Sequence, residues 1–108
     1  AHALGASYKG KPIGDLSDFT VFSFQAIKHL TTGDGGAIVC LDDKNASEVS
    51  RRRWFNIDRD KAAFSILGER EYNSEQIGYK YHMNDLAAAL GLANLEEVEK
   101  TFLRHREI

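Results

Sequence analysis

The stretch that decides the fold runs from residue 19 to residue 41 and consists of two apolar runs separated by a lone lysine and a glycine-rich turn. It reads Phe19-Thr20-Val21-Phe22-Ser23-Phe24-Gln25-Ala26-Ile27-Lys28, then His29-Leu30-Thr31-Thr32-Gly33-Asp34-Gly35-Gly36, then Ala37-Ile38-Val39-Cys40-Leu41. β-Branched and aromatic residues favour strands, and clustered glycines supply the positive-φ conformers that turns need. The stretch therefore predicts two strands joined by a tight turn beside Lys28. The second run is apolar throughout, which predicts a strand buried on both faces.

Sequence punctuation outside this stretch places the other elements. Glycines and the single proline predict a turn or short hairpin over residues 7–14, and an aspartate pair predicts a capped helix over about 44–54. Residues 56–76 are polar and weakly periodic, which predicts a long loop with one helical turn near 64–67. Asn84 is expected to cap a helix from Asp85 to about Glu107, whose apolar positions recur three to five residues apart.

Size and composition are those of one ordinary globular domain and exclude several classes of protein. The chain has 108 residues, 43% hydrophobic and 28% charged, with a formal net charge of -2, so nothing argues for nucleic-acid binding. No apolar run approaches the roughly 18 residues needed to span a bilayer. With a single cysteine, Cys40, the expectation is a cytoplasmic protein without a membrane anchor. The four histidines (His2, His29, His82 and His105) are too scattered for a zinc pattern, so no metal is expected.

Lys28 has an ordinary interpretation and a chemical one. Most lysines that follow a strand are solvated. However, Lys28 lies between a strand and a glycine turn, where active sites of α/β proteins collect, and its neighbours Ile27 and Leu30 are apolar. Desolvation would lower the pKa of the amine and make it a nucleophile able to form a Schiff base. Ser23 would lie on the same rim and suit a phosphate oxygen, although a strand serine bonded to backbone is the commoner case.

The segment around Trp54 also admits two interpretations. Trp54-Phe55 follows three consecutive arginines and precedes Asp58-Arg59-Asp60. Such arginines are most often a solvated helix end, or they line a site for an anionic ligand together with the aromatic rings. Residues 54–60 are also a hypothetical determinant of substrate specificity.

Three blocks of the chain, in order, resemble the DegT/DnrJ/StrS family of pyridoxal-phosphate (PLP) enzymes. The blocks are Ala1-His2-Ala3-Leu4-Gly5-Ala6 with Gly10-Lys11-Pro12-Ile13-Gly14-Asp15, the stretch from Phe22 to Gly36, and Ile77-Gly78-Tyr79-Lys80-Tyr81-His82-Met83-Asn84-Asp85-Leu86 continuing to Leu95. The family consists mostly of aminotransferases acting on nucleotide-linked keto sugars. The resemblance implies an α/β fold of the aspartate aminotransferase-like type (fold type I), with a mostly parallel sheet flanked by helices.

The resemblance also implies roles for particular residues. Lys28 is at the position of the lysine that binds PLP as a Schiff base, and Ser23 is at the position of a serine that binds the cofactor phosphate. His2 matches a position near the phenolic oxygen of the cofactor. His82 matches a position that in some members reaches the cofactor phosphate of the neighbouring subunit, because the family active site lies at a homodimer interface. The partners implied are a nucleotide-sugar substrate and an amino-acid donor, with glutamate expected.

The resemblance further implies that residues 1–108 are the central part of the PLP-binding large domain. The N-terminal part, with the aspartate that pairs with the pyridine nitrogen, and the C-terminal small domain are expected outside this chain. Two alternatives remain at this stage. Some family members are sugar dehydratases with histidine in place of the lysine, and a non-catalytic fragment could act through packing of the 85–107 helix.

Overall fold

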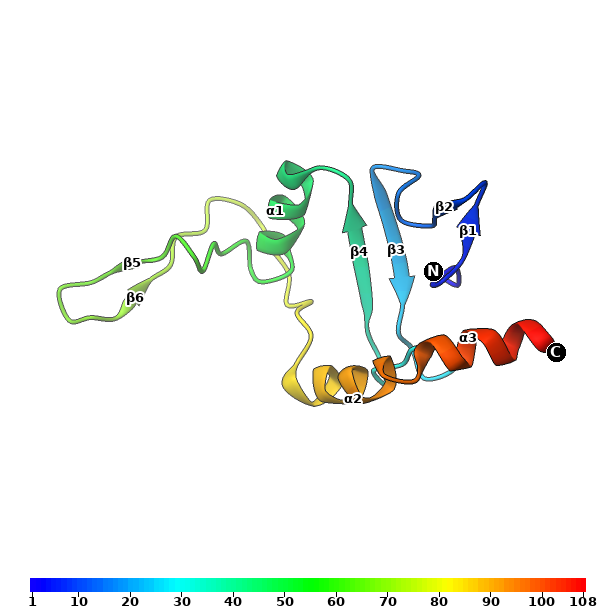
Figure 1. The fold of residues 1–108 in the computed structure, drawn as a ribbon. Coiled ribbons are helices and arrows are strands. Elements are labelled where there is room, and N and C mark those ends of the chain that lie inside the picture. The colour runs from blue at the N-terminus through cyan, green and yellow to red at the C-terminus, as the bar shows by residue number, and fades with distance from the viewer. The chain divides into compact units, whose positions relative to one another are not determined.

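The computed structural model describes all residues from 1 to 108, which form two compact units. The first unit comprises residues 1–42 and 83–108, and the second comprises residues 43–82. The first unit contains β1 (Ser7–Tyr8), β2 (Lys11–Pro12), β3 (Phe19–Ser23), β4 (Gly36–Cys40), α2 (Asp85–Leu95) and α3 (Val98–Glu107) (Figure 1). The second contains α1 (Asp43–Arg52), β5 (Ala63–Phe64) and β6 (Arg70–Glu71). None of the helices is long and apolar enough to cross a membrane.

The first unit is built on the antiparallel pair of β3 and β4. The register runs from Phe19 opposite Cys40 to Ser23 opposite Gly36, so both predicted strands are confirmed. The pairing within this chain differs from the mostly parallel sheet expected, since all its strand pairs are antiparallel. The physical reason is the short connection, because parallel neighbours need a crossover, usually through a helix.

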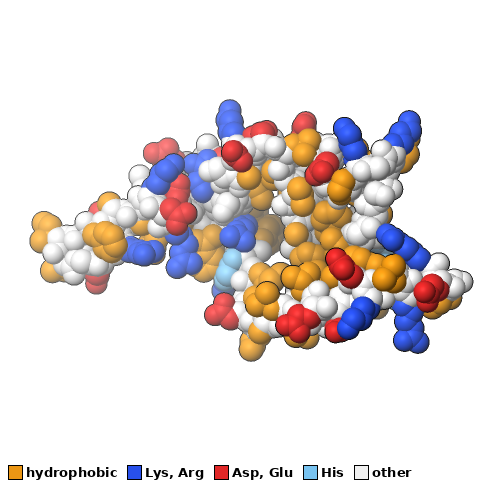
Figure 2. All heavy atoms as spheres, viewed as in Figure 1, with side chains coloured by type: hydrophobic (Ala, Val, Ile, Leu, Met, Phe, Trp, Pro, Cys, Tyr) orange, Lys and Arg blue, Asp and Glu red, His pale blue; other side chains and the backbone are white.

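The expected burial of β4 on both faces is wrong within this chain. Ile38 is 49% exposed and Leu41, just beyond the strand, is 53% exposed. Hydrophobic side chains are visible over β3 and β4 and along α2 in the space-filling view (Figure 2). The core is correspondingly small and consists of Phe22, Leu30 and Val98, with the polar Thr32 buried beside them.

The helical part of the first unit differs from the single helix expected over 85–107. Asn84 caps α2 as predicted, with its side-chain oxygen accepting a hydrogen bond from the Ala87 N–H at 2.9 Å. The chain then turns after Leu95, where the Glu97 N–H donates to the Asn94 carbonyl three residues back. The turn buries Val98, the first residue of α3. Glu96 and Glu97, the two residues before it, are polar, and a straight helix through them would not favour this burial. Both helices run across the end of the β3–β4 pair at which the two strands are connected (Figure 1).

Two short hairpins complete the fold. The expected hairpin near residues 7–14 is confirmed by β1 and β2, whose turn places Lys9 and Gly10 at positive φ. The helical turn expected at 64–67 is wrong, because β5 and β6 form a hairpin there instead. Ser65 closes this hairpin, since its hydroxyl accepts hydrogen bonds from the N–H groups of Leu67 and Glu69 and its own N–H donates to the Glu69 carbonyl. Gly68 supplies the positive φ that the turn requires.

The close approach of β3 and β4 generates a stability prediction at Gly36. A Cβ at this position would lie 2.6 Å from the carbonyl oxygen of Phe22 on β3. We expect Gly36→Ala to lower the free energy of unfolding of the intact protein by about 1–3 kcal/mol, as overpacking does. Urea denaturation measures it. The control is Gly10→Ala, where the space is open and only the positive φ is unfavourable. A loss at Gly36 no larger than the loss at Gly10 would contradict this account of the strand pair.

Candidate active site

Lys28 lies in the connection between β3 and β4, which its own backbone hydrogen bonds hold in shape. The Phe24 N–H donates to the Gly35 carbonyl at 2.8 Å, and the Phe24 carbonyl accepts from the Thr32 N–H at 2.9 Å. Within the connection the Lys28 N–H donates to the Gln25 carbonyl at 2.9 Å. Lys28 is half-buried, so its side chain is confined on one side and reachable on the other.

The amine of Lys28 faces an imidazole. Its Nζ lies 2.9 Å from Nε2 of His2, within hydrogen-bond distance. Of the two apolar neighbours expected to desolvate the lysine, Leu30 is 8% exposed but Ile27 is 82% exposed. The expected shielding by Ile27 is therefore wrong within this chain, and the contact with His2 is the distinctive feature of the lysine. An amine in contact with an imidazole nitrogen is a pair that can exchange a proton.

His2 reaches Lys28 because the segment that precedes β1 runs beside the end of β3. The Ser23 N–H donates to the Ala1 carbonyl at 3.1 Å. The same segment is tied to α3, where the Arg106 guanidinium donates to the Gly5 carbonyl at 3.0 Å. The contact between Arg106 and Gly5 was not foreseen from the sequence, because these residues are far apart in the chain.

Ser23 ends β3 and begins the connection that holds Lys28. Its hydroxyl oxygen accepts a hydrogen bond from the Gln25 N–H at 3.3 Å, so the commoner state of a strand serine bonded to backbone is present. The hydroxyl hydrogen remains available to a ligand oxygen. The structure thus places Ser23, Lys28 and His2 in one unit, with an amine, a hydroxyl and an imidazole on the segments around the end of β3.

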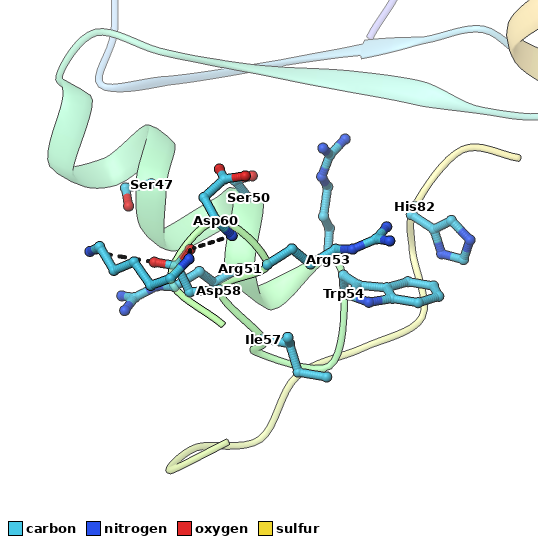
Figure 3. A pocket seen from close by; sticks show the side chains of 11 residues that line it. Ser47, Ser50, Arg51, Arg53, Trp54, Ile57, Asp58, Asp60 and His82 are labelled. Atoms are coloured by element: carbon cyan, nitrogen blue, oxygen red, sulfur yellow. Dashed lines mark hydrogen bonds and ion pairs between the residues drawn. The ribbon is translucent and has the colours of Figure 1, made fainter. Parts of the chain in front are cut away.

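His82 lies in the second unit, beside Trp54. The two ring centroids are 4.0 Å apart and nearly perpendicular, and Nδ1 of His82 is buried without a hydrogen-bond partner (Figure 3). The role that the resemblance implies for His82 therefore remains a prediction. Over the whole chain, no group of three or more histidine, cysteine or acidic side chains is arranged to hold a metal ion.

The second unit also contains a cavity of about 470 Å³ around Trp54. Its lining carries three arginines and one lysine against two aspartates, and the Arg59 guanidinium lies 5.7 Å from the centre of a Trp54 ring. Asp58 pairs with Lys61 (Figure 3). Desolvation raises the pKa of the Asp58 carboxyl, but the hydrogen bonds from Lys61 outweigh this effect and lower that pKa. The cavity has the charge expected for an anionic ligand, and that function remains a prediction. Its lining residues are Ser47, Ser50, Arg51, Arg53, Trp54, Ile57, Asp58, Arg59, Asp60, Lys61 and His82.

Comparison with known proteins shows that this chain is similar to part of several solved sugar aminotransferases. The chain superimposes on CalS13, a sugar aminotransferase from Micromonospora echinospora, with a TM-score of 0.87 and 41% sequence identity over 99% of this chain and 28% of that one. It matches Spr1654 of Streptococcus pneumoniae in a PMP-form (TM-score 0.82, 33% identity, 99% of this chain and 28% of that one). The PLP-form gives a TM-score of 0.76 and 35% identity over 93% of this chain and 25% of that one.

The family model for the DegT/DnrJ/EryC1/StrS aminotransferases matches residues 1–108, and the chain belongs to that family. The UDP-4-amino-4,6-dideoxy-N-acetyl-beta-L-altrosamine transaminase of Campylobacter jejuni (serotype O:23/36) is 34% identical over 110 residues, covering 100% of this chain and 27% of that protein. This chain therefore spans just over a quarter of the length of such relatives. Its fold is the corresponding part of fold type I, as the resemblance implied.

The arginines beside the cavity generate a prediction for the titration of Glu48 on α1. Hydrogen bonds from Arg52 and then Arg51 hold the pKa of the Glu48 carboxyl below its usual range. A lowered pKa in the folded state stabilises the fold above the unfolded pKa, and this contribution is lost as the pH falls through the folded value. We expect ¹³C NMR to give a low titration midpoint for Glu48 that rises in Arg52→Gln.

Arg53→Gln is the matched control, because it removes the same charge one position along without removing a hydrogen bond to Glu48. If both variants raised the midpoint equally, general charge rather than the hydrogen bonds would set the pKa.

Proposed function

We propose that the protein containing this chain is a PLP-dependent aminotransferase that transfers nitrogen from an amino acid, glutamate, to a nucleotide-linked keto sugar. The observation that carries the proposal is the contact of Lys28 Nζ with His2 Nε2 at 2.9 Å. Lys28 lies on the loop that begins with Ser23 at the end of β3. Membership of an aminotransferase family and the sugar-transaminase names of its relatives support the same reaction.

The side chains near the end of β3 suit PLP. Lys28 supplies the primary amine that binds the aldehyde carbon of the cofactor, and Ser23 supplies a hydroxyl for a phosphate oxygen. His2 supplies an imidazole 2.9 Å from the amine. When bound, PLP acts as an electron sink that stabilises negative charge on the substrate carbon.

The protein's own part in the reaction is then to hold the cofactor and to move protons. Lys28 would hold the cofactor through its amine. Once free, the Nζ amine would take a proton from the substrate carbon and deliver it to the cofactor, acting first as a general base and then as a general acid. His2, whose Nε2 lies 2.9 Å from Nζ, would orient the amine during this transfer.

We further propose that the chain is the central part of the PLP-binding large domain. The share of the relatives that it spans, 27–28%, supports the view that the chain is one part of a longer protein. So do the exposed apolar side chains of β3 and β4, such as Val21 at 54% and Ile38 at 49%, which suit a position inside a larger sheet.

A homodimer with a shared active site is part of the proposal. In it, His82 would bind the cofactor phosphate of the neighbouring subunit. The buried, unpartnered Nδ1 of His82 supports a role for this ring beyond packing on Trp54. A cytoplasmic location is also proposed, supported by the single free cysteine, Cys40.

Replacement of Lys28 tests the assignment of the amine. In the intact protein, Lys28→Ala is expected to abolish the visible absorbance of bound cofactor and to lower kcat for transamination at least about a thousandfold, because covalent attachment and proton transfer are lost together. Lys100→Ala, a substitution of an exposed lysine paired with Glu97, is the control and is expected to change neither. Activity retained in Lys28→Ala would refute the proposed function.

Replacement of Ser23 tests the phosphate contact. A hydrogen bond to a charged group contributes about 1.5–3 kcal/mol, so Ser23→Ala is expected to weaken PLP binding about tenfold to a hundredfold. Titration of the apoprotein followed by absorbance measures this affinity. Ser7→Ala, in the exposed β1 strand, is the control. Unchanged affinity in Ser23→Ala would remove Ser23 from the cofactor site.

A further inference from the structure

We propose that the end of α3 positions Lys28 against His2, with three side chains that we call the α3 clamp: Phe102, His105 and Arg106. The inference rests on the proposed function in one respect, namely that the Lys28 amine is the group to be positioned. The clamp contacts both segments that carry the pair, one through the residue after Lys28 and the other through the segment that begins with His2.

The first contact is an aromatic cluster beside Lys28. The ring of His29 meets the ring of His105 edge to face, with centroids 4.6 Å apart and planes at 88°. The ring of Phe102 meets the same His29 ring at 5.6 Å and 66°. Because His29 directly follows Lys28, two rings of α3 that hold the His29 side chain also restrict the backbone from which the Lys28 side chain extends.

The loop has separate anchors on α2, so the clamp is not its only support. The Asn94 side-chain amide donates to the Thr31 carbonyl at 2.9 Å. A Cβ at Gly91 would lie 2.8 Å from the Thr32 Cγ2, which shows how closely α2 approaches the loop. These contacts fix the loop after Leu30, whereas the His29 cluster acts next to the lysine itself. Loss of the clamp should therefore loosen the residues around Lys28 without unfolding the loop.

The second contact is on the segment of His2. Gly5 adopts φ +77, and a Cβ there would lie 2.5 Å from the Phe102 ring, so only glycine allows this approach. The Arg106 guanidinium donates to the Gly5 carbonyl at 3.0 Å. One turn of α3 thus holds both the His2 segment and the Lys28 loop.

This arrangement sets the separation of the two functional groups. A hydrogen bond weakens steeply when its atoms move apart or out of line, and a catalytic pair must be held to within about 0.5 Å. His2 and Lys28 belong to different segments, and the ring and guanidinium contacts of α3 connect those segments on one side. His105 and Arg106 are therefore positioning residues for the pair.

Hydrogen exchange of the intact protein without added cofactor tests the clamp. Exchange of the amides in residues 24–35, among them the hydrogen-bonded Lys28 and Thr32 amides, is followed by mass spectrometry. We expect His105→Ala to accelerate exchange at Lys28 about threefold to tenfold, the effect of losing one aromatic pair. Arg104→Ala is the matched control on the same exposed turn and is expected to leave it unchanged, and His105→Phe, which keeps the ring, is expected to restore slow exchange. Equal exchange in the His105→Ala and Arg104→Ala proteins would overturn the proposal.

A kinetic cycle separates positioning from general stability. His105→Ala is expected to lower kcat about threefold to tenfold with KM unchanged, but to have no further effect in a protein that already carries His2→Ala. Additive losses would show that His105 does not act through the His2–Lys28 pair and would overturn the clamp.

Arg106→Met is expected to accelerate exchange of residues 1–6, which tests the second contact independently. Failure of the proposed function is distinguishable, because it would appear as retained activity in Lys28→Ala whatever the exchange results.

Discussion

The backbone of Phe24 is the constraint on which the lysine site depends. Its N–H donates to the Gly35 carbonyl at 2.8 Å, and its carbonyl accepts from the Thr32 N–H at 2.9 Å and from the Thr31 hydroxyl at 3.2 Å. Backbone polar groups removed from water must find partners, and here the hydrogen bonds to those partners join the two ends of the loop directly after β3. This closure continues the β3–β4 register into the loop and fixes the direction from which Lys28 projects.

Helical side chains then hold the closed loop from outside. Asn94 of α2 bonds the Thr31 carbonyl, and Gly91 of the same helix allows its close approach to Thr32. The sequence has small residues along this helix, and the contact with Thr32 shows that they allow the helix to pack closely against the loop. Leu30 and Thr32 are buried at this junction, so this end of the loop forms part of the core.

Local chemistry explains what the sequence predicted well. The strands at 19–23 and 36–40 follow from β-branched and aromatic composition, and the Asn84 cap follows from the capping preference of asparagine. The hairpin at 63–71 was missed because Ser65 closes it with hydrogen bonds that leave little trace in hydrophobic periodicity. The break between α2 and α3 was missed because it depends on the burial of Val98, which is a tertiary effect.

The candidate site divides in the same way. Lys28 and Ser23 stand out because a strand, a lysine and a glycine turn are adjacent in the sequence. The resemblance placed His2 and Lys28 at the same cofactor, but their direct contact, and that of His29 with His105, join residues distant in the chain and are seen only in the folded structure. The exposed Ile27 corrects the expectation that this side chain shields the amine, and the structure places the imidazole of His2 in contact with Nζ instead.

The central claim is that Lys28 is the amine that binds PLP, and reductive trapping tests it most directly. The intact protein would be incubated with PLP, reduced with borohydride and digested, and the modified peptide would be located by mass spectrometry. The account predicts a single phosphopyridoxyl group, on Nζ of Lys28. Modification spread over exposed lysines such as Lys44 and Lys100, with none on Lys28, would contradict it.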